Sequence, residues 1–247
     1  MRWLFVLLTC LITTISDARP LIIGTAPENP PLSFQADKNH FYGFEVDLMN
    51  DICKRIHLSC IYKPVESSDV LSELANGKID IAIAALILPS KPTNGLAFSL
   101  PYLQTGGQFM TLASSLISTP LNLKNKKVGV RRGTLTGGDL YKKLVMEIYD
   151  NQVTVIEYLS MDALMAALSN KEIDAVFSNE LPIMYWYHNH QKIYKLIGSN
   201  IPLNNSYAIM SNKKNIPLIE KINHGLLDTI ADGTYLKIYN RYFSSLR

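Results

Sequence analysis

A short phrase occurs twice in this 247-residue chain and constrains its fold more than any other feature. The two copies, at 74–80 and 168–174, share the spacing L-x-N-x-x-I-D. Each copy ends a predicted helix and leads at once into an apolar run that is typical of a strand. Two similar α/β units on one chain predict two lobes with a cleft between them, and such clefts usually hold small molecules.

Strands and helices alternate in the first unit. The apolar segments 21–24, 61–62 and 79–88 are predicted strands, and the last is apolar enough to be covered on both faces. Segment 44–56 has an apolar residue every four positions, and 69–77 ends in Asn-Gly, so both are predicted helices. Strand, helix, strand, helix, strand in this order predicts parallel pairing with right-handed crossovers.

The second unit repeats this alternation. Its predicted strands are 126–130, 153–156 and 175–177, and a predicted helix occupies 162–169. A glycine-rich turn at 131–138 leads into a further helix. The pattern therefore predicts a second α/β lobe.

The chain crosses between the predicted lobes twice. A change of pattern near 98–107 marks the first crossing, and 202–206 marks the return. We predict an α/β fold of two lobes, with mixed, mainly parallel sheets joined by two hinge crossings. Lobe 1 comprises 19–105 and 206–247, and lobe 2 comprises 106–205.

Residues 1–18 are predicted to be an export signal. Arg2 provides the positive start, the apolar run 3–15 is too short to span a bilayer, and cleavage is expected near Ala18. A lipoprotein with Cys10 as the lipidated residue is the alternative, although Cys10 lies inside the apolar run. No later segment is long and apolar enough to span a membrane, so we expect a soluble mature protein.

Removal of the signal leaves Cys53 and Cys60, an even pair in an exported chain. Export favours oxidation, so we predict a disulfide that closes a short loop. Two buried free thiols are the alternative. In either case the pair is expected to be structural rather than reactive.

Several chemistries are not expected. The net charge of +3 is spread along the chain without a basic run, which argues against nucleic acid as a partner. His188 and His190 lie two apart in a predicted helix and so face different sides, which argues against a metal site. Gly137 and Gly138 lack the lysine of a phosphate loop. We predict no metal, no cofactor and no enzymatic activity.

Taken together, the motifs resemble the polar amino-acid-binding family of periplasmic solute-binding proteins that serve ABC transporters. The resemblance covers essentially the whole mature chain and rests on 43–48 (GFEVDL), 53–60, 77–80 and 232–235 (DGTY). Segment 53–60 is most similar to lysine/arginine/ornithine- and histidine-binding members, whose equivalent cysteines are bridged; glutamine-binding members also resemble the chain. The resemblance implies a bilobed periplasmic-binding-protein fold, a monomer in the periplasm, and a cognate ABC permease in the inner membrane.

The chain departs from this family where its members hold an α-amino acid. The family's arginine that binds the ligand carboxylate aligns with Pro92 of this chain. The family's aspartate that binds the ligand ammonium group aligns with Asn179. Two serines of the family align with Ala84 and Ala85, and the aromatic residue that stacks on the ligand in the family aligns with a position at or near Asn29. A buried charge without its partner is costly. We therefore expect that the chain does not hold a free α-amino acid in the family's usual way.

Arg131 is the candidate replacement for these charges. It precedes a turn at Gly133 and Thr134 that resembles the family's anion-friendly turn, at a position where members usually carry an apolar or small polar residue. In the alternative, Arg131 points to solvent and Arg132 forms a surface pair. The predicted ligand-binding set is Glu28, Asn29, Ser67, Ala84, Ala85, Ile87, Arg131, Thr134, Leu135, Thr136 and Asn179.

We predict a solute-binding protein of an ABC importer that captures an amino-acid-like or other small polar or anionic solute by lobe closure. Two alternatives remain open. Some proteins of this fold are cyclohexadienyl-type dehydratases, and here Glu28 or Glu180 would be the proton donor. The other alternative is a ligand-silent module that binds a partner protein, which would suit the apolar residues Ala84, Ala85 and Ile87.

Overall fold

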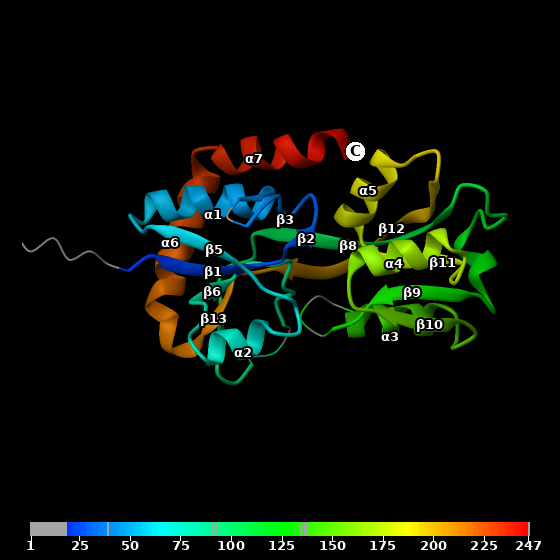
Figure 1. Cartoon of the computed structure of the whole chain (residues 1–247), viewed down its shortest axis with the longest axis horizontal. Helices are drawn as coiled ribbons and strands as arrows, with labels where there is room; N and C mark the ends of the chain where they lie inside the picture. The colour runs from blue at the N-terminus through cyan, green and yellow to red at the C-terminus, as the bar shows by residue number, and fades with distance from the viewer. Residues whose placement is uncertain are drawn as a thin grey trace, which may run out of the picture.

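The computed structural model describes residues 19–38, 40–89, 91, 93–133, 135 and 138–246, and for Asn204 the backbone alone. The predicted signal at 1–18 lies outside the described residues. Two lobes lie side by side along the long axis of the molecule, each built on one sheet with helices on both faces (Figure 1). This mixed α/β architecture with two sheets confirms the predicted fold class.

The first sheet has the strand order β5-β1-β6-β13-β7. Its strands are β1 (Leu21–Thr25), β5 (Cys60–Pro64), β6 (Ile81–Ala82), β7 (Leu96–Phe98) and β13 (Met210–Asn212), with helices α1 (Phe44–Arg55), α2 (Val70–Ala75), α6 (Ile216–Ala231) and α7 (Thr234–Phe243). Strand β1 is parallel to β5 and β6, whereas β13 is antiparallel to β6 and β7. A small sheet of β2 (Glu28–Asn29), β3 (Ser33–Gln35) and β4 (Phe41–Tyr42) lies beside it.

The second sheet has the strand order β10-β9-β11-β8-β12. Its strands are β8 (Leu103–Leu112), β9 (Lys127–Arg131), β10 (Thr154–Tyr158), β11 (Ala175–Asn179) and β12 (Tyr194–Tyr207), with helices α3 (Gly138–Ile148), α4 (Met161–Ser169) and α5 (Glu180–Asn189). Strand β9 is parallel to β10 and β11, and β8 is antiparallel to β11 and β12. Short 3-10 turns are η1 (Pro120–Leu123), η2 (Lys213–Asn215) and η3 (Ser244–Leu246).

The repeated phrase has the same structural role in both lobes. Its asparagines are the C-caps of α2 and α4, and its apolar residues are buried. Its aspartates tie the next strand to the sheet: Asp80 Oδ2 accepts the N–H of Ile22 at 2.9 Å, and Asp174 Oδ2 accepts the N–H of Lys127 at 2.8 Å. The repeat is thus a helix-to-strand connection that both sheets use.

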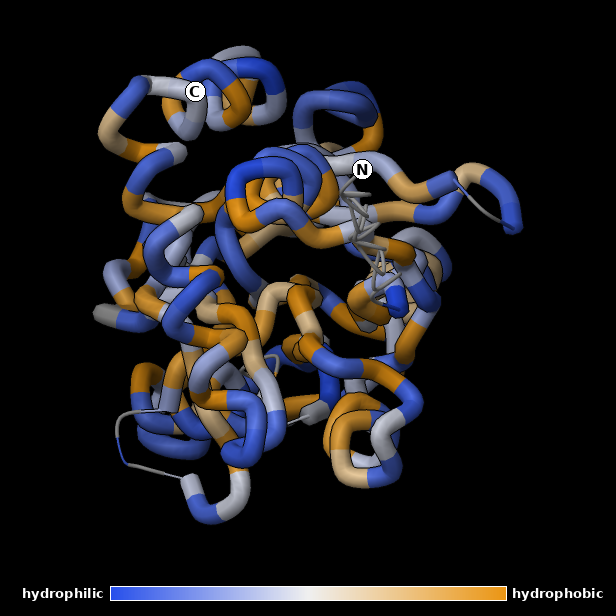
Figure 2. Tube along the Cα trace, turned by 90° about the vertical axis from the view of Figure 1, so that its left-hand side faces the viewer, coloured by the Kyte–Doolittle hydropathy of each residue, from blue (hydrophilic) through white to orange (hydrophobic). Residues whose placement is uncertain are grey.

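Each sheet is covered on both faces by apolar side chains. In the first lobe, Ile52 of α1 packs with α6 and α7 on one face, and Leu74 of α2 packs on the other. In the second lobe, Tyr141 of α3 and Leu164 of α4 occupy opposite faces. Viewed from the end of the molecule, hydrophobic segments gather inside and the outer turns are mainly hydrophilic (Figure 2). Burial of these faces provides most of the driving force for folding.

Two long antiparallel strands, β8 and β12, connect the lobes (Figure 1). Their pairing extends to Leu103 and Tyr207, next to the first sheet, and Ile87 forms an isolated bridge with Tyr207. The predicted return crossing at 202–206 is therefore the last part of β12. The predicted lobe boundaries after residues 105 and 205 remain a prediction.

The predicted strand at 79–88 is wrong for most of its length, since only Ile81 and Ala82 join the sheet as β6. Ala85 has a left-handed φ of 52°, and its N–H donates to Oε1 of Glu45 at 2.7 Å rather than to a strand. The segment stays buried because its side chains belong to the two apolar clusters on either face of the first sheet. Apolar composition alone therefore misled the strand assignment.

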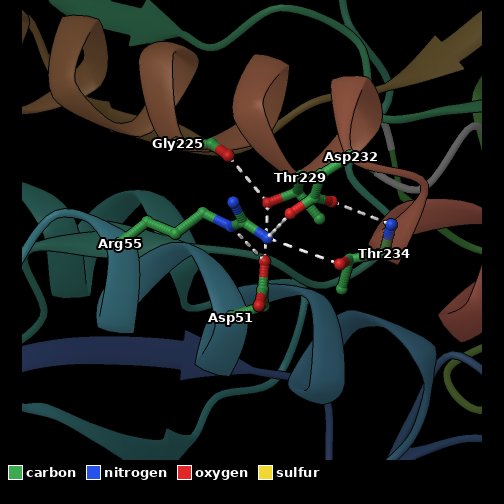
Figure 3. Close-up of polar contacts among 6 residues, drawn as sticks. All are labelled: Asp51, Arg55, Gly225, Thr229, Asp232 and Thr234. Carbon is green, nitrogen blue, oxygen red and sulfur yellow. Dashed lines mark hydrogen bonds and ion pairs between the residues drawn. The ribbon is translucent and has the colours of Figure 1, made fainter.

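A polar network joins α1 to the start of α7, and we call it the α1–α7 corner (Figure 3). It consists of Asp51, Arg55, Thr229, Asp232 and Thr234. Arg55 lies 2.6 Å from a carboxylate oxygen of each aspartate, and Asp232 also accepts the N–H of Thr234 at 2.9 Å. The corner ties the last turns of α1 to the motif at 232–235.

The start of α1 depends on a glycine. Gly43 has a φ of 129°, and a Cβ there would lie 2.2 Å from the carbonyl oxygen of Leu32. No other residue type fits that space and that conformation. At the other end of the helix, Cys53 and Cys60 form the predicted disulfide, which confirms that prediction.

Candidate functional site

Most of the described residues of the predicted site lie between the lobes, at the carboxyl ends of parallel strands. Arg131 ends β9 and Asn179 ends β11 in the second lobe, and Ala84 and Ala85 follow β6 in the first. Small molecules usually bind at this edge of an open α/β sheet. The assignment of these residues to a ligand site remains a prediction.

Among the described residues, hydrogen bonds cross the cleft at two places. The N–H of Ile87 donates to the carbonyl oxygen of Leu135 at 2.8 Å, and Nη1 of Arg131 donates to Oδ1 of Asn29 at 3.4 Å. Leu135 also packs against the apolar cluster of the first lobe beneath α2. The lobes are therefore in contact across the cleft, and Arg131 is part of that contact.

The side chain of Arg131 is half-buried, and its guanidinium has a neutral hydrogen-bond partner. Its Nε is buried and has no hydrogen-bond partner among the described residues. Burial lowers the pKa of Arg131, and the nearby Tyr207, Tyr141 and Glu66 only partly oppose this effect. No ion pair to Arg131 occurs in the described part of the chain. The alternative in which Arg131 points to solvent is wrong.

Asn29 and Glu28 lie on opposite faces of β2. The Asn29 side chain is buried and reaches Arg131, whereas Glu28 is exposed. Adjacent strand residues alternate in this way. Glu180, the other carboxylate considered as a proton donor, is half-buried in the first turn of α5.

Asn179 uses its side chain within the protein. Its Oδ1 accepts the N–H of Leu181 at 3.1 Å as the N-cap of α5, and its amide nitrogen donates to Oγ1 of Thr105. Both groups lie beside the hydroxyl of Tyr141, where burial raises the tyrosine pKa and the two polar side chains oppose the rise. The position that holds the ligand ammonium group in the family thus caps a helix here.

A buried carboxyl group lies at the hinge, and sequence reasoning missed it. Oε1 of Glu45 accepts the N–H of Ala85 and the hydroxyl of Tyr102. Burial raises the pKa of Glu45 to about 7, and these hydrogen bonds oppose the rise. Tyr207, which is buried beside Arg131, also has a raised pKa, mainly because of burial. No local signal identified Glu45, because an isolated glutamate in a helix is usually solvated.

A cavity of about 980 Å³ opens between the lobes. Its described lining residues are Glu66, Ser67, Ser68, Leu71, Ile87, Leu88, Pro89, Lys91, Thr93, Leu96, Phe98, Arg132, Gly133, Leu135, Leu140, Leu159 and Asn205. Of the predicted set, Ser67, Ile87 and Leu135 line it, whereas Asn29, Ala84, Ala85, Arg131 and Asn179 are not among these lining residues. Thr134, Thr136 and Pro92 lie outside the described residues.

The described residues show neither a candidate metal cluster nor a membrane-spanning helix. No group of three or more His, Cys, Asp or Glu side chains there could hold a metal ion. His190 instead stacks on Trp186, with ring centroids 5.2 Å apart. No helix in that part of the chain is both long and apolar enough to cross a bilayer.

The chain is similar to several known binding proteins. It is 26% identical over 230 residues to a putative ABC transporter arginine-binding protein 2 of Escherichia coli (strain K12), covering 92% of this chain and 91% of the relative. It is 25% identical over 234 residues to the histidine-binding periplasmic protein of the same organism, covering 90% and 86% respectively.

A solved structure shows the same fold. The crystal structure of an arginine 3rd transport system periplasmic binding protein from Legionella pneumophila is 36% identical to the chain and superposes with a TM-score of 0.82, covering 91% of this chain and 99% of the other. The model of the bacterial extracellular solute-binding proteins, family 3, matches residues 21–245. The resemblance predicted from the motifs is confirmed, and the chain belongs to the bacterial extracellular solute-binding proteins of family 3.

Proposed function

We propose that this protein is the periplasmic solute-binding component of an ABC importer and captures an amino-acid-like or other small anionic solute by lobe closure. The observation that carries the proposal is the guanidinium of Arg131, which reaches across the cleft to Asn29 and forms no ion pair with a described carboxylate. Relatives named as arginine- and histidine-binding proteins support the transport role. The solute would be handed to a cognate permease in the inner membrane, and the binding protein would act as a monomer.

The charge of Arg131 supports an anionic group on the solute. Among the described residues, the direct hydrogen-bond partner of this half-buried cation is an amide oxygen, so its charge is poorly compensated. A carboxylate or similar anion would provide short, charge-assisted hydrogen bonds to the guanidinium. The amide of Asn179 is already used by Leu181 and Thr105, so the ammonium site of the family has no free equivalent there.

Closure would follow from contacts that the solute makes with both lobes. The Arg131–Asn29 and Ile87–Leu135 hydrogen bonds join the lobes in the present arrangement. A solute that binds Arg131 and the first lobe together favours this closed state by population shift. The energy for uptake would come from the ATPase of the transporter rather than from this chain.

Native mass spectrometry of freshly purified protein is the experiment that identifies a retained solute. Calorimetry with that solute then compares the wild type with Arg131→Gln, which removes the charge and keeps a polar side chain. Arg241→Gln is the matched control, because Arg241 on α7 pairs with Asp47 on α1, away from the cleft. Loss of affinity in Arg131→Gln alone supports the proposal.

Two outcomes contradict the proposal. Equal affinity of Arg131→Gln and the wild type would show that Arg131 does not bind the solute. Absence of any retained solute, together with no thermal stabilisation across a broad metabolite panel, would favour the ligand-silent alternative. A true ligand at a hundredfold excess over its dissociation constant stabilises a protein by about 2.7 kcal/mol, which such a panel detects.

A further inference from the structure

Building on the proposed function, we infer that the solute carries a large apolar body next to its anionic group, and that the cavity between the lobes holds this body. The inference concerns the substrate class of the same cleft. It depends on three observations: the lining of the cavity, the charges at the cavity and the position of Arg131.

The lining is the first observation. Apolar side chains come from both lobes: Leu71, Leu96 and Phe98 from the first, and Leu140 and Leu159 from the second. Leu71 is 45% exposed, Leu140 is 39% exposed and Leu159 is 74% exposed. A cluster of exposed leucines around a cavity marks a binding surface more often than scattered single residues do. Covering them with an apolar group would release water from both partners.

The size of the cavity agrees with this reading. Its volume of about 980 Å³ lies near the upper end of the range of roughly 300–1,000 Å³ that small-molecule sites span. A compact polar solute would leave much of this volume without contacts. A solute with an aromatic or alkyl body would fill it and contact both lobes.

The charges are the second observation. Among the described lining residues, Lys91 and Arg132 are basic and Glu66 is the acidic counterpart, so positive groups outnumber negative ones. A cationic solute would meet this excess of positive charge as well as Arg131. An anionic solute is therefore favoured over a basic one.

Arg131 lies next to residues that line the cavity. The two residues that follow it, Arg132 and Gly133, line the cavity. Tyr207, which is buried beside Arg131, forms a bridge with Ile87, which also lines the cavity. An anionic group bound by Arg131 would thus place its attached body among the leucines.

A series of simple probes tests the inference. Calorimetry with butanoate, hexanoate and octanoate, and with the corresponding primary alcohols, separates the effects of chain length and charge. We expect affinity to rise about fourfold per added methylene, the equivalent of ~0.8 kcal/mol, and the carboxylates to bind more tightly than the alcohols. Affinity that is independent of chain length, or tighter binding of free arginine or glutamate than of octanoate, overturns the inference.

Variants locate the apolar body. Leu159→Gln should weaken octanoate binding at least tenfold and have a smaller effect on butanoate. Leu116→Gln is the matched control, because Leu116 is 98% exposed and is not a lining residue of the cavity. Circular dichroism and thermal melting verify that both variants fold. Equal octanoate affinity of Leu159→Gln and the wild type contradicts the inference.

Failure of the inference differs from failure of the proposed function. If Arg131→Gln abolishes binding of a retained solute and Leu159→Gln does not, the apolar-body inference is wrong and the role of Arg131 stands. If Leu159→Gln weakens binding and Arg131→Gln does not, the cavity holds a solute but Arg131 does not recognise it.

Discussion

The α1–α7 corner and the cleft each contain an arginine, but the two arginines differ in their hydrogen-bond partners and in the direction of their pKa shift. Arg55 lies 2.6 Å from carboxylate oxygens of Asp51 and Asp232, and its hydrogen bonds to them raise its pKa (Figure 3). Arg131 has Asn29 as its hydrogen-bond partner at 3.4 Å, and burial lowers its pKa. The corner satisfies its charges within the protein. The cleft leaves a half-buried cation that an anion from outside could satisfy.

The largest expected effect tests this contrast directly. Arg131→Met keeps the apolar stem and removes the guanidinium, so affinity for a retained anionic solute should fall by more than about 100-fold, because charge-assisted hydrogen bonds are lost. The solute-free protein should be no less stable, because an incompletely satisfied half-buried charge is removed. Calorimetry and urea unfolding measure the two quantities. Lower stability of the solute-free variant would show that Arg131 belongs to the scaffold, as Arg55 does.

The hinge carboxyl group should make stability depend on pH. The pKa of Glu45 is raised by burial from 4.5 to about 7, so the folded state retains a proton that the unfolded state releases between these values. Stability from this group is complete below about pH 4.5 and is lost as the pH rises through about 7, by up to about 3 kcal/mol.

Urea unfolding near pH 5 and near pH 8 measures this loss. The control is Glu45→Gln, which keeps the hydrogen bond from Ala85 and cannot ionise. The difference between wild type and variant should grow in favour of the variant as the pH rises. A constant difference would show that Glu45 does not titrate in this range.

The disulfide should contribute to the stability of the fold near the α1–α7 corner and should not affect solute binding in the cleft. Cys53 and Cys60 are seven residues apart, and closing so short a loop should stabilise the protein by about 2 kcal/mol. The double variant Cys53→Ser with Cys60→Ser should therefore unfold at lower urea concentration and bind its solute with unchanged affinity. A reduced affinity would mean that the corner and the cleft are coupled.

The smallest expected effect concerns Arg55. Arg55→Gln breaks two ion pairs that are partly exposed to solvent, so the melting temperature should fall slightly and solute affinity should not change. High salt should reduce the difference from the wild type, because it screens these pairs. A loss of affinity in this variant would remove the distinction between the two arginines.

Local patterns predicted most helices and the connection that both lobes share. The helix at 69–77 is α2 with its cap at Asn76, and the helix at 162–169 is α4. These predictions succeeded because capping and apolar periodicity are properties of neighbouring residues. The strand prediction at 79–88 failed because the N–H of Ala85 donates to Glu45, forty residues away in the chain, and not to a neighbouring strand.

The candidate site was only partly predictable. Sequence reasoning selected Arg131 but left its direction open, and it missed Tyr141, Tyr207 and Glu45 as buried polar groups near the cleft. In the sequence, Tyr141 is indistinguishable from an ordinary core residue of α3. The residues next to Glu45 in the chain do not indicate that the hinge buries its side chain. The apolar cavity was missed because its leucines come from separate elements of both lobes.

By itself, the sequence determined the two α/β units, the disulfide and the family, because these depend on short-range spacing and on motifs that persist along the chain. Tertiary structure alone decided that the charge of Arg55 is paired with carboxylates and that the charge of Arg131 is not. The reason is physical: the energy of a charge depends on the burial and the partners that distant segments provide. Asp232 reaches Arg55 from the far end of the chain, whereas none of the described carboxylates forms an ion pair with Arg131.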